Sequence, residues 1–253
     1  PWFAFREFCG LELVSFYAEK AKVIGANDSR HRSCHSQASC CHILMPNFTS
    51  TGPIDFEDLI DVVYSDQPEF GWDAYSTEDY FVGCDADLLL SLLGQGQRLV
   101  NNEFNTHSQD PRIMARTSWA MIGKGLKGIT YCTFQQARHL WEYAMWSVLE
   151  PDFTPRDKLG AIADVNHEIR RLERLLGSAA PAPFVKPVAL YYSRMDLSLP
   201  QGAIGVYSSA IDSPYRVYEV LRGLGYPVRW VTPRRIEAGA LDASLAPLVM
   251  KKS

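Results

Sequence analysis

The sequence lacks several features that would each indicate a particular class of protein. No run approaches the ~18 consecutive apolar residues of a membrane-spanning helix, and no internal repeat or low-complexity tract is present. Positive charge is not in excess, because 25 Lys and Arg stand against 29 Asp and Glu, a net charge of −4. The sequence therefore offers no broad basic field for binding nucleic acid or an anionic membrane.

Cysteine is also too sparse to hold the fold together by disulfides. Six cysteines in 253 residues fall below the density of a disulfide scaffold, and no signal peptide is visible. We therefore expect a reduced, cytoplasmic setting. The composition is otherwise that of a globular protein, with 47% hydrophobic, 21% charged and 12% aromatic residues, enough to bury a core.

Helical and short apolar segments alternate along the chain. Clusters of β-forming residues predict strands at 32–37, 70–75, 98–104, 128–134, 188–192, 228–231 and 248–250. Helical periodicity predicts helices over 12–22, 56–64, 85–93, 111–125, 155–177 and 214–223. Strands that alternate with helices are typical of parallel sheets built from βα units.

Capping residues mark several of the expected helix ends. Asp110 precedes Pro111 and Thr154 precedes Pro155, and each pair matches an N-cap followed by a proline at the first helical position. Gly94 follows another helical segment, and glycine is the residue that most often ends a helix.

A linker divides the chain into two expected domains. Residues 178–187 contain three Ala and three Pro, a composition typical of a linker. We expect one domain over residues 1–178 and a second over residues 187–253. The first holds about four βα units, half the number in a (β/α)8 barrel, so it is either a small doubly wound domain or half a barrel. A chain that opens at Pro1 without a methionine favours half a barrel.

Several motifs in a fixed order carry a resemblance to a known family. They are FREFCGLELVSFYAEKA at 5–21, FGWDAY at 70–75, LVNNEF at 99–104, WAMIGKGLKGITY at 119–131 and the helix over 152–176. In this order they resemble the later strands and helices of family-42 glycoside hydrolases, the β-galactosidase-type (β/α)8 enzymes. Residues 188–250 are similar to the start of that family's flavodoxin-like domain.

The resemblance implies a specific architecture. It implies an α/β fold, in which the C-terminal half of a (β/α)8 TIM barrel is followed by a partial flavodoxin-like α/β domain. Because that second domain makes trimers in the family, we expect the full-length protein to form a homo-oligomer, a trimer. The expected partner is a carbohydrate substrate, with no nucleic acid and no membrane.

Glu103 is the candidate catalytic residue. The residues alone place it at the carboxyl end of an expected strand, the end that faces the active site in βα architectures. The resemblance implies that Glu103 is the nucleophile of a retaining glycosidase, which acts on terminal β-galactosides or related β-glycosides. Such an enzyme needs a second carboxylate ~5–5.5 Å away to protonate the leaving group. On the residues alone, Glu103 could equally be a solvated loop residue.

The resemblance places the general acid outside this sequence. In the family the acid lies in an Asn-Glu pair at the end of the fourth strand, and Asn102–Glu103 is the only such pair here. We therefore expect the acid upstream of Pro1 and negligible glycosidase activity from the 253-residue chain alone. A relative of the same fold that had lost the acid would instead be a non-catalytic carbohydrate-binding protein.

The resemblance also implies residues that contact the sugar. Asp73 and Tyr75, on the expected sixth strand, would bind sugar hydroxyls or orient the acid, and Asn102 would bind substrate beside the nucleophile. After the eighth strand, Glu142 would hold the sugar and Trp141 would stack on its ring. On the residues alone these side chains could instead cap turns or pack in the core.

A stretch rich in Cys and His at residues 31–42 is the remaining candidate site. Its spacing lacks the two clean ligand pairs of a zinc site, although three cysteines and three histidines could supply ligands. The alternatives are a loop without a site, or a fifth strand end that places His35 in the cleft. We adopt the last for His35 and expect no metal and no cofactor.

Overall fold

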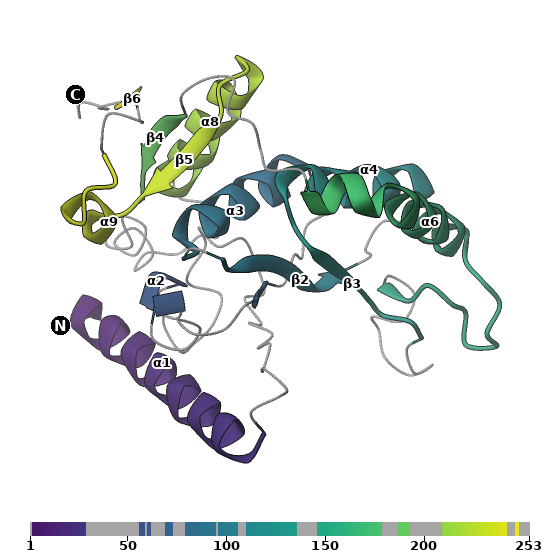
Figure 1. Ribbon diagram of the computed structural model, residues 1–253, viewed down its shortest axis with the longest axis horizontal. Helices are drawn as coiled ribbons and strands as arrows, with labels where there is room; N and C mark the ends of the chain where they lie inside the picture. The colour runs from purple at the N-terminus through teal and green to yellow at the C-terminus, as the bar shows by residue number, and fades with distance from the viewer. Residues whose placement is uncertain are drawn as a thin grey trace.

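The computed structural model describes residues 2–28, 56–58, 60–61, 69–72, 79–94, 96–105, 110–135, 146–178, 187–192, 209–241 and 246–247. They form an α/β structure with two separate parallel sheets (Figure 1). The expected α/β class is therefore confirmed, whereas the strands in these ranges do not close into a barrel.

The first sheet has three parallel strands in sequence order: β1 (Glu69–Trp72), β2 (Arg98–Asn105) and β3 (Gly128–Cys132). Parallel strands need a crossover between them, and two helices supply it: α3 (Asp79–Leu92) and α4 (Pro111–Lys124). Helix α6 (Asp157–Ser178) follows β3. Helix α4 packs between α3 and α6, so the three helices form one layer beside β2 and β3 (Figure 1).

The second sheet has β4 (Val188–Tyr191) at its centre, flanked by β5 (Val228–Val231) and β6 (Ala246–Pro247), all parallel. Helix α8 (Ser209–Gly223) connects β4 to β5, and the short helix α9 (Pro233–Glu237) follows β5. The alternation of strand and helix thus resumes after the predicted linker, as the sequence indicated.

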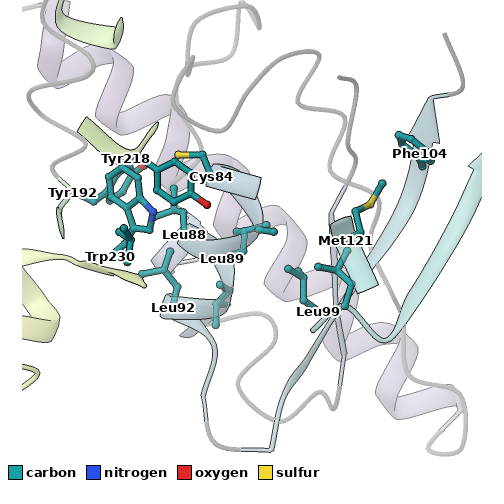
Figure 2. Packing of buried hydrophobic residues seen from close by; sticks show 14 of the residues in the cluster. Cys84, Leu88, Leu89, Leu92, Leu99, Phe104, Met121, Tyr192, Tyr218 and Trp230 are labelled. Carbon is teal, nitrogen blue, oxygen red and sulfur yellow. The ribbon is translucent and has the colours of Figure 1, made fainter. Parts of the chain in front are cut away.

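One hydrophobic cluster connects the two sheets through α3. Leu88, Leu89 and Leu92 of α3 are all 0% exposed, because the helix contacts α4 and β2 as well as β5 and α8. Figure 2 shows these leucines between Leu99 and Met121 on one side and Trp230 on the other. Helix α3 is therefore buried from two directions, which explains why consecutive leucines, Leu88 and Leu89, are both buried.

Helix α1 (Trp2–Asn27) includes the expected segment 12–22 as its later part, but it is not the amphipathic helix that was expected. Val14 is buried, and three neighbours on the same face pack against the core: Tyr17, Ala18 and Ala21. The opposite face exposes 54–62% of Phe5, Phe8, Phe16 and Val23. The expectation of one apolar face was wrong because large apolar residues lie on both sides of the helix.

None of the helices in the described ranges is both long and apolar enough to cross a membrane.

Several element boundaries differ from those expected. Helix α3 begins at Asp79 rather than at residue 85, and α8 begins at Ser209 rather than at Pro214. Helix α6 begins only at Asp157, because Pro155 forms a bridge with Leu149 instead of the first helical turn. Strand β3 ends two residues early, at Cys132, and residues 248–250 lie outside the described residues. Sequence cues mark helix ends only to within about a turn.

Candidate functional site

The middle strand of the first sheet carries a β-bulge next to Glu103. Between β2 and β3, Asn101 lies opposite Ile129 and Phe104 lies opposite Tyr131. Three steps along β2 therefore match two steps along β3. One additional residue on one strand of a pair defines a β-bulge. Bulges often change the direction of a side chain next to an active site.

Two side chains that flank the bulge both face the helix layer. Asn101 is 1% exposed, and its Nδ2 donates to Met121 Sδ on α4 at 3.4 Å. Phe104 packs on the Tyr131 ring, with centroids 5.8 Å apart, and the Tyr131 hydroxyl donates to Ser118 on α4. In a regular strand, residues three apart point to opposite faces.

The bulge changes which residues of β2 face the helices. Asn102 lies on the face opposite the helices, against Gly71 of β1, and both Asn102 and Glu103 are partly buried. A regular strand would place Glu103 on the same face as Asn101, against α4. In the observed register Phe104, and not Glu103, lies opposite Tyr131 on that side.

A local hydrogen bond satisfies the backbone within the bulge. The Glu103 N–H donates to Asn101 Oδ1 at 2.9 Å. A bulge leaves a backbone group without its partner on the neighbouring strand, and buried backbone groups need partners. The Asn101 side chain therefore supplies an acceptor at the position where the pairing with β3 shifts.

Asn102 lies over the neighbouring strand β1 at Gly71. A Cβ atom built on Gly71 would lie 2.1 Å from Asn102 Nδ2 and 2.3 Å from its Oδ1. No side chain tolerates such distances, so Gly71 provides space that the amide occupies. Glycine inside a strand often marks such a close approach.

Charged side chains gather where α6 begins, beyond the end of β3. The Arg156 side chain donates to Glu150 Oε2 at 3.1 Å, and the Arg156 N–H donates to the Val148 carbonyl. The following Lys158 is 0% exposed. Burial, with a smaller contribution from the nearby Arg156 charge, lowers the pKa of Lys158 from 10.5 to about 8.

This charged group lies at the same edge of the sheet as Glu103. The backbone of 146–149 hydrogen-bonds to Thr133 and Phe134, which directly follow β3. Because β2 and β3 are parallel, their carboxyl ends lie at one edge. The charges that act on Lys158 are those of Arg156 and Glu150, within the charged group itself.

Of the residues predicted from sequence, the structure describes Glu103 and Asn102, which are neighbours near the carboxyl end of β2. The other predicted residues lie outside the described residues: His35, Asp73, Tyr75, Trp141 and Glu142. The Cys/His stretch at 31–42 lies outside them too. In the ranges that are described, no three His, Cys, Asp or Glu side chains are grouped as metal ligands would be.

The sequence prediction missed two residues that shape this face, Asn101 and Gly71. Each had a weak signal, since Asn101 directly follows the apolar pair Leu99–Val100 and Gly71 is a glycine within a strand. Neither signal identifies a partner. The partners, Met121 and Asn102, come from other elements and are set by the tertiary fold.

The fold is similar to those of solved β-galactosidases. A polyextremophilic β-galactosidase from the Antarctic haloarchaeon Halorubrum lacusprofundi superimposes with a TM-score of 0.67 at 16% identity. A β-galactosidase from the psychrophilic Marinomonas ef1 gives 0.65 at 21%. A catalytic mutant of a GH42 β-galactosidase from G. stearothermophilus gives 0.54 at 19%. At these identities the likeness shows a shared fold.

The likeness covers most of this chain but a smaller part of the others. It extends over 91%, 88% and 75% of this chain, in the same order, and over 36%, 37% and 30% of those structures. The chain thus spans about a third of their length. No protein-family model and no curated protein matches the sequence.

Proposed function

We propose that this protein is a retaining glycoside hydrolase that acts on terminal β-galactosides or related β-glycosides, with Glu103 as its nucleophile. The observation that carries the proposal is the bulge in β2, which brings Phe104 rather than Glu103 opposite Tyr131 on the helix-facing side. Glu103 would then turn to the face on which Asn102 lies. In (β/α)8 enzymes this face is the barrel interior, and catalytic residues come from the carboxyl ends of the strands. The likeness to β-galactosidase structures supports the same interpretation.

The proposed reaction proceeds in two displacements. The Glu103 carboxylate attacks the anomeric carbon, and the leaving group departs with a proton from a general acid. The same acid, now a base, then removes a proton from a water molecule that hydrolyses the glycosyl-enzyme. The proposal includes no cofactor, and Asn102 is placed to bind a sugar hydroxyl next to the bond that breaks.

The proposal extends to the architecture of the whole protein. Residues 1–178 would form the C-terminal half of a TIM barrel, and residues 187–253 would form part of a flavodoxin-like domain that makes a trimer. The general acid would come from a part of the protein outside the 253 residues. Asp73, Tyr75, Trp141, Glu142 and His35 would line the same cleft.

Trapping of the glycosyl-enzyme tests the nucleophile directly. The full-length protein is incubated with an activated 2-deoxy-2-fluoro-β-galactoside, and the labelled peptide is identified by mass spectrometry. We expect one adduct, on Glu103, and loss of both adduct and turnover in Glu103→Gln. Glu168→Gln is the matched control, because Glu168 is an exposed carboxylate on α6 that pairs with Arg171.

Three results would contradict the proposal or a part of it. An adduct on another carboxylate would exclude Glu103 as the nucleophile. Binding of galactosides without turnover or adduct would favour a non-catalytic carbohydrate-binding protein. Clear turnover of an aryl galactoside by residues 1–253 alone would place the general acid within them.

A further inference from the structure

We infer that Asn101 is a positioning residue for Glu103: its buried carboxamide holds the β-bulge that turns the Glu103 side chain out of the helix-facing side of the sheet. The catalytic meaning of this inference rests on the proposed function. The structural meaning, that one amide side chain fixes the bulge, does not depend on it.

The first step of the argument is the hydrogen bond within the bulge. Asn101 Oδ1 accepts the Glu103 N–H at 2.9 Å, and Asn101 is 1% exposed. Without this acceptor the Glu103 N–H, which is only partly exposed to water, would need another partner. The regular register with β3 would then become the competing arrangement.

The second step is the way in which the amide itself is held. Asn101 Nδ2 donates to Met121 Sδ at 3.4 Å, and Met121 is 0% exposed on α4. Because only the amide oxygen can accept the backbone N–H, this arrangement fixes which end of the amide faces Glu103. The chain of contacts ties the bulge to the helix layer.

The third step concerns the carboxylate. In a regular strand, residue 103 would share the face of Asn101 and point at the buried side of α4. A carboxylate is poorly tolerated there without a partner. Loss of the bulge would therefore move the nucleophile from one face of the sheet to the other, which stops attack on the sugar while leaving other sugar contacts in place.

Four variants of the full-length protein separate positioning from general stability. Asn101→Leu removes the acceptor at similar size, and Asn101→Ala removes it without apolar bulk. Asn101→Asp keeps an oxygen at the same place. Leu99→Val is the matched control, since Leu99 is 0% exposed on the same face of β2 and loses only packing.

Two readouts are measured on each variant. The first is hydrogen–deuterium exchange resolved to the Glu103 amide, and the second is the rate of trapping by the fluorinated galactoside together with kcat and KM. For Asn101→Leu we expect exchange about tenfold faster or more. We expect trapping and kcat about a hundredfold slower, with KM within about threefold. Asn101→Asp should restore part of both, and Leu99→Val should change neither.

The outcomes distinguish this inference from the proposed function. Unchanged exchange at Glu103 in Asn101→Leu, or in Asn101→Ala should the leucine variant fail to fold, overturns the inference even where Glu103→Gln is inactive. Faster exchange combined with an active Glu103→Gln supports the structural role of Asn101 and overturns Glu103 as nucleophile. If Leu99→Val and Asn101→Leu lowered kcat equally, the loss in Asn101→Leu would be explained by lower stability of the fold. That result would overturn the positioning role of Asn101.

Discussion

The side-chain amide of Asn102 on β2 lies against the backbone of Gly71 on the neighbouring strand β1, and only the hydrogen atom of a glycine fits between them. A methyl group on Gly71 would come within 2.5 Å of three Asn102 side-chain atoms. Gly71→Ala should therefore force Asn102 into another rotamer. We expect kcat/KM for an aryl galactoside to fall about as far as in Asn102→Ala, and the two changes to be non-additive when combined.

Gly128→Ala is the matched control for that prediction. Gly128 lies on β3 of the same sheet, but there a Cβ would approach Val100 Cγ1 no closer than 3.3 Å. Its thermal unfolding and kcat/KM should remain near those of the unchanged protein. Full activity in Gly71→Ala together with a large loss in Asn102→Ala would show that the amide does not need its observed position.

A closed polar triad forms where α3, α4 and α8 meet. The Tyr218 hydroxyl donates to Asp87 Oδ2 at 2.7 Å and accepts from Lys124 Nζ at 2.7 Å, while Lys124 also pairs with Asp87. Tyr218→Phe should lower the free energy of unfolding by about 1–2 kcal/mol, because two partly buried charges each lose a partner. Chemical denaturation measures the loss.

The ring of Tyr218 provides an internal control in that experiment. It stacks near Trp230 at 6.3 Å between centroids, and phenylalanine keeps this contact. Tyr226→Phe removes an exposed hydroxyl instead and should change stability by less than about 0.5 kcal/mol. In a double-mutant cycle with Asp87→Asn, additive losses would show that the hydroxyl and carboxylate do not interact energetically.

Local features of the fold could be predicted from sequence because they depend on neighbours along the chain. Asp110 caps α4 by accepting the Arg112 N–H at 2.8 Å, Pro111 occupies the first turn, and Gly125 ends the helix at φ 107°. Each interaction spans only a few residues. The strand at 228–231 was predictable from its β-forming composition, and the strand at 98–104 from its apolar start, Leu99 and Val100.

The shape of the candidate site could not be predicted in this way. The sequence placed Glu103 at a strand end, but the face to which it points depends on the register between β2 and β3. That register is held partly by Asn101 and Met121, which are 20 residues apart. A one-residue change in register reverses the face of every following side chain, and no pattern in the sequence of β2 alone reveals it.

Glu57 is a buried carboxylate that joins α2 (Phe56–Asp58) to the end of the second sheet. It is 5% exposed, and it accepts from Thr232 Oγ1 at 2.8 Å and from Arg235 Nε at 3.0 Å. Arg235→Met removes the guanidinium that pairs with Glu57. Because Arg235 is itself 29% exposed, we expect a loss of about 2 kcal/mol, below the 3–5 kcal/mol typical of a fully buried pair.

The adjacent arginine is the control for that loss. Arg234 also pairs with carboxylates, those of Asp58 and Asp61, but its side chain is 52% exposed. Arg234→Met should therefore cost no more than about 1 kcal/mol in urea unfolding. Equal losses for the two variants would indicate that burial of Glu57 does not determine the strength of its pair.

Lys158 makes the stability of the protein depend on pH. Burial lowers its pKa from 10.5 to about 8 in the folded state, whereas an unfolded chain has the ordinary value of about 10.4. Between these values the unfolded state binds more protons than the folded state, so the free energy of unfolding rises with pH. One unit of pKa corresponds to about 1.4 kcal/mol, and the rise should be a few kcal/mol at most.

Lys158→Met separates this effect from other groups that titrate in the same window. The difference in unfolding free energy between the unchanged protein and Lys158→Met should be constant below about pH 7. It should then shift in favour of the unchanged protein as the pH rises to about 10, because only that protein releases a proton on folding. Lys127→Met, which replaces an exposed lysine, should show no such shift. A Lys158→Met difference that stays flat from pH 7 to 10 would mean that Lys158 keeps its ordinary pKa in the fold.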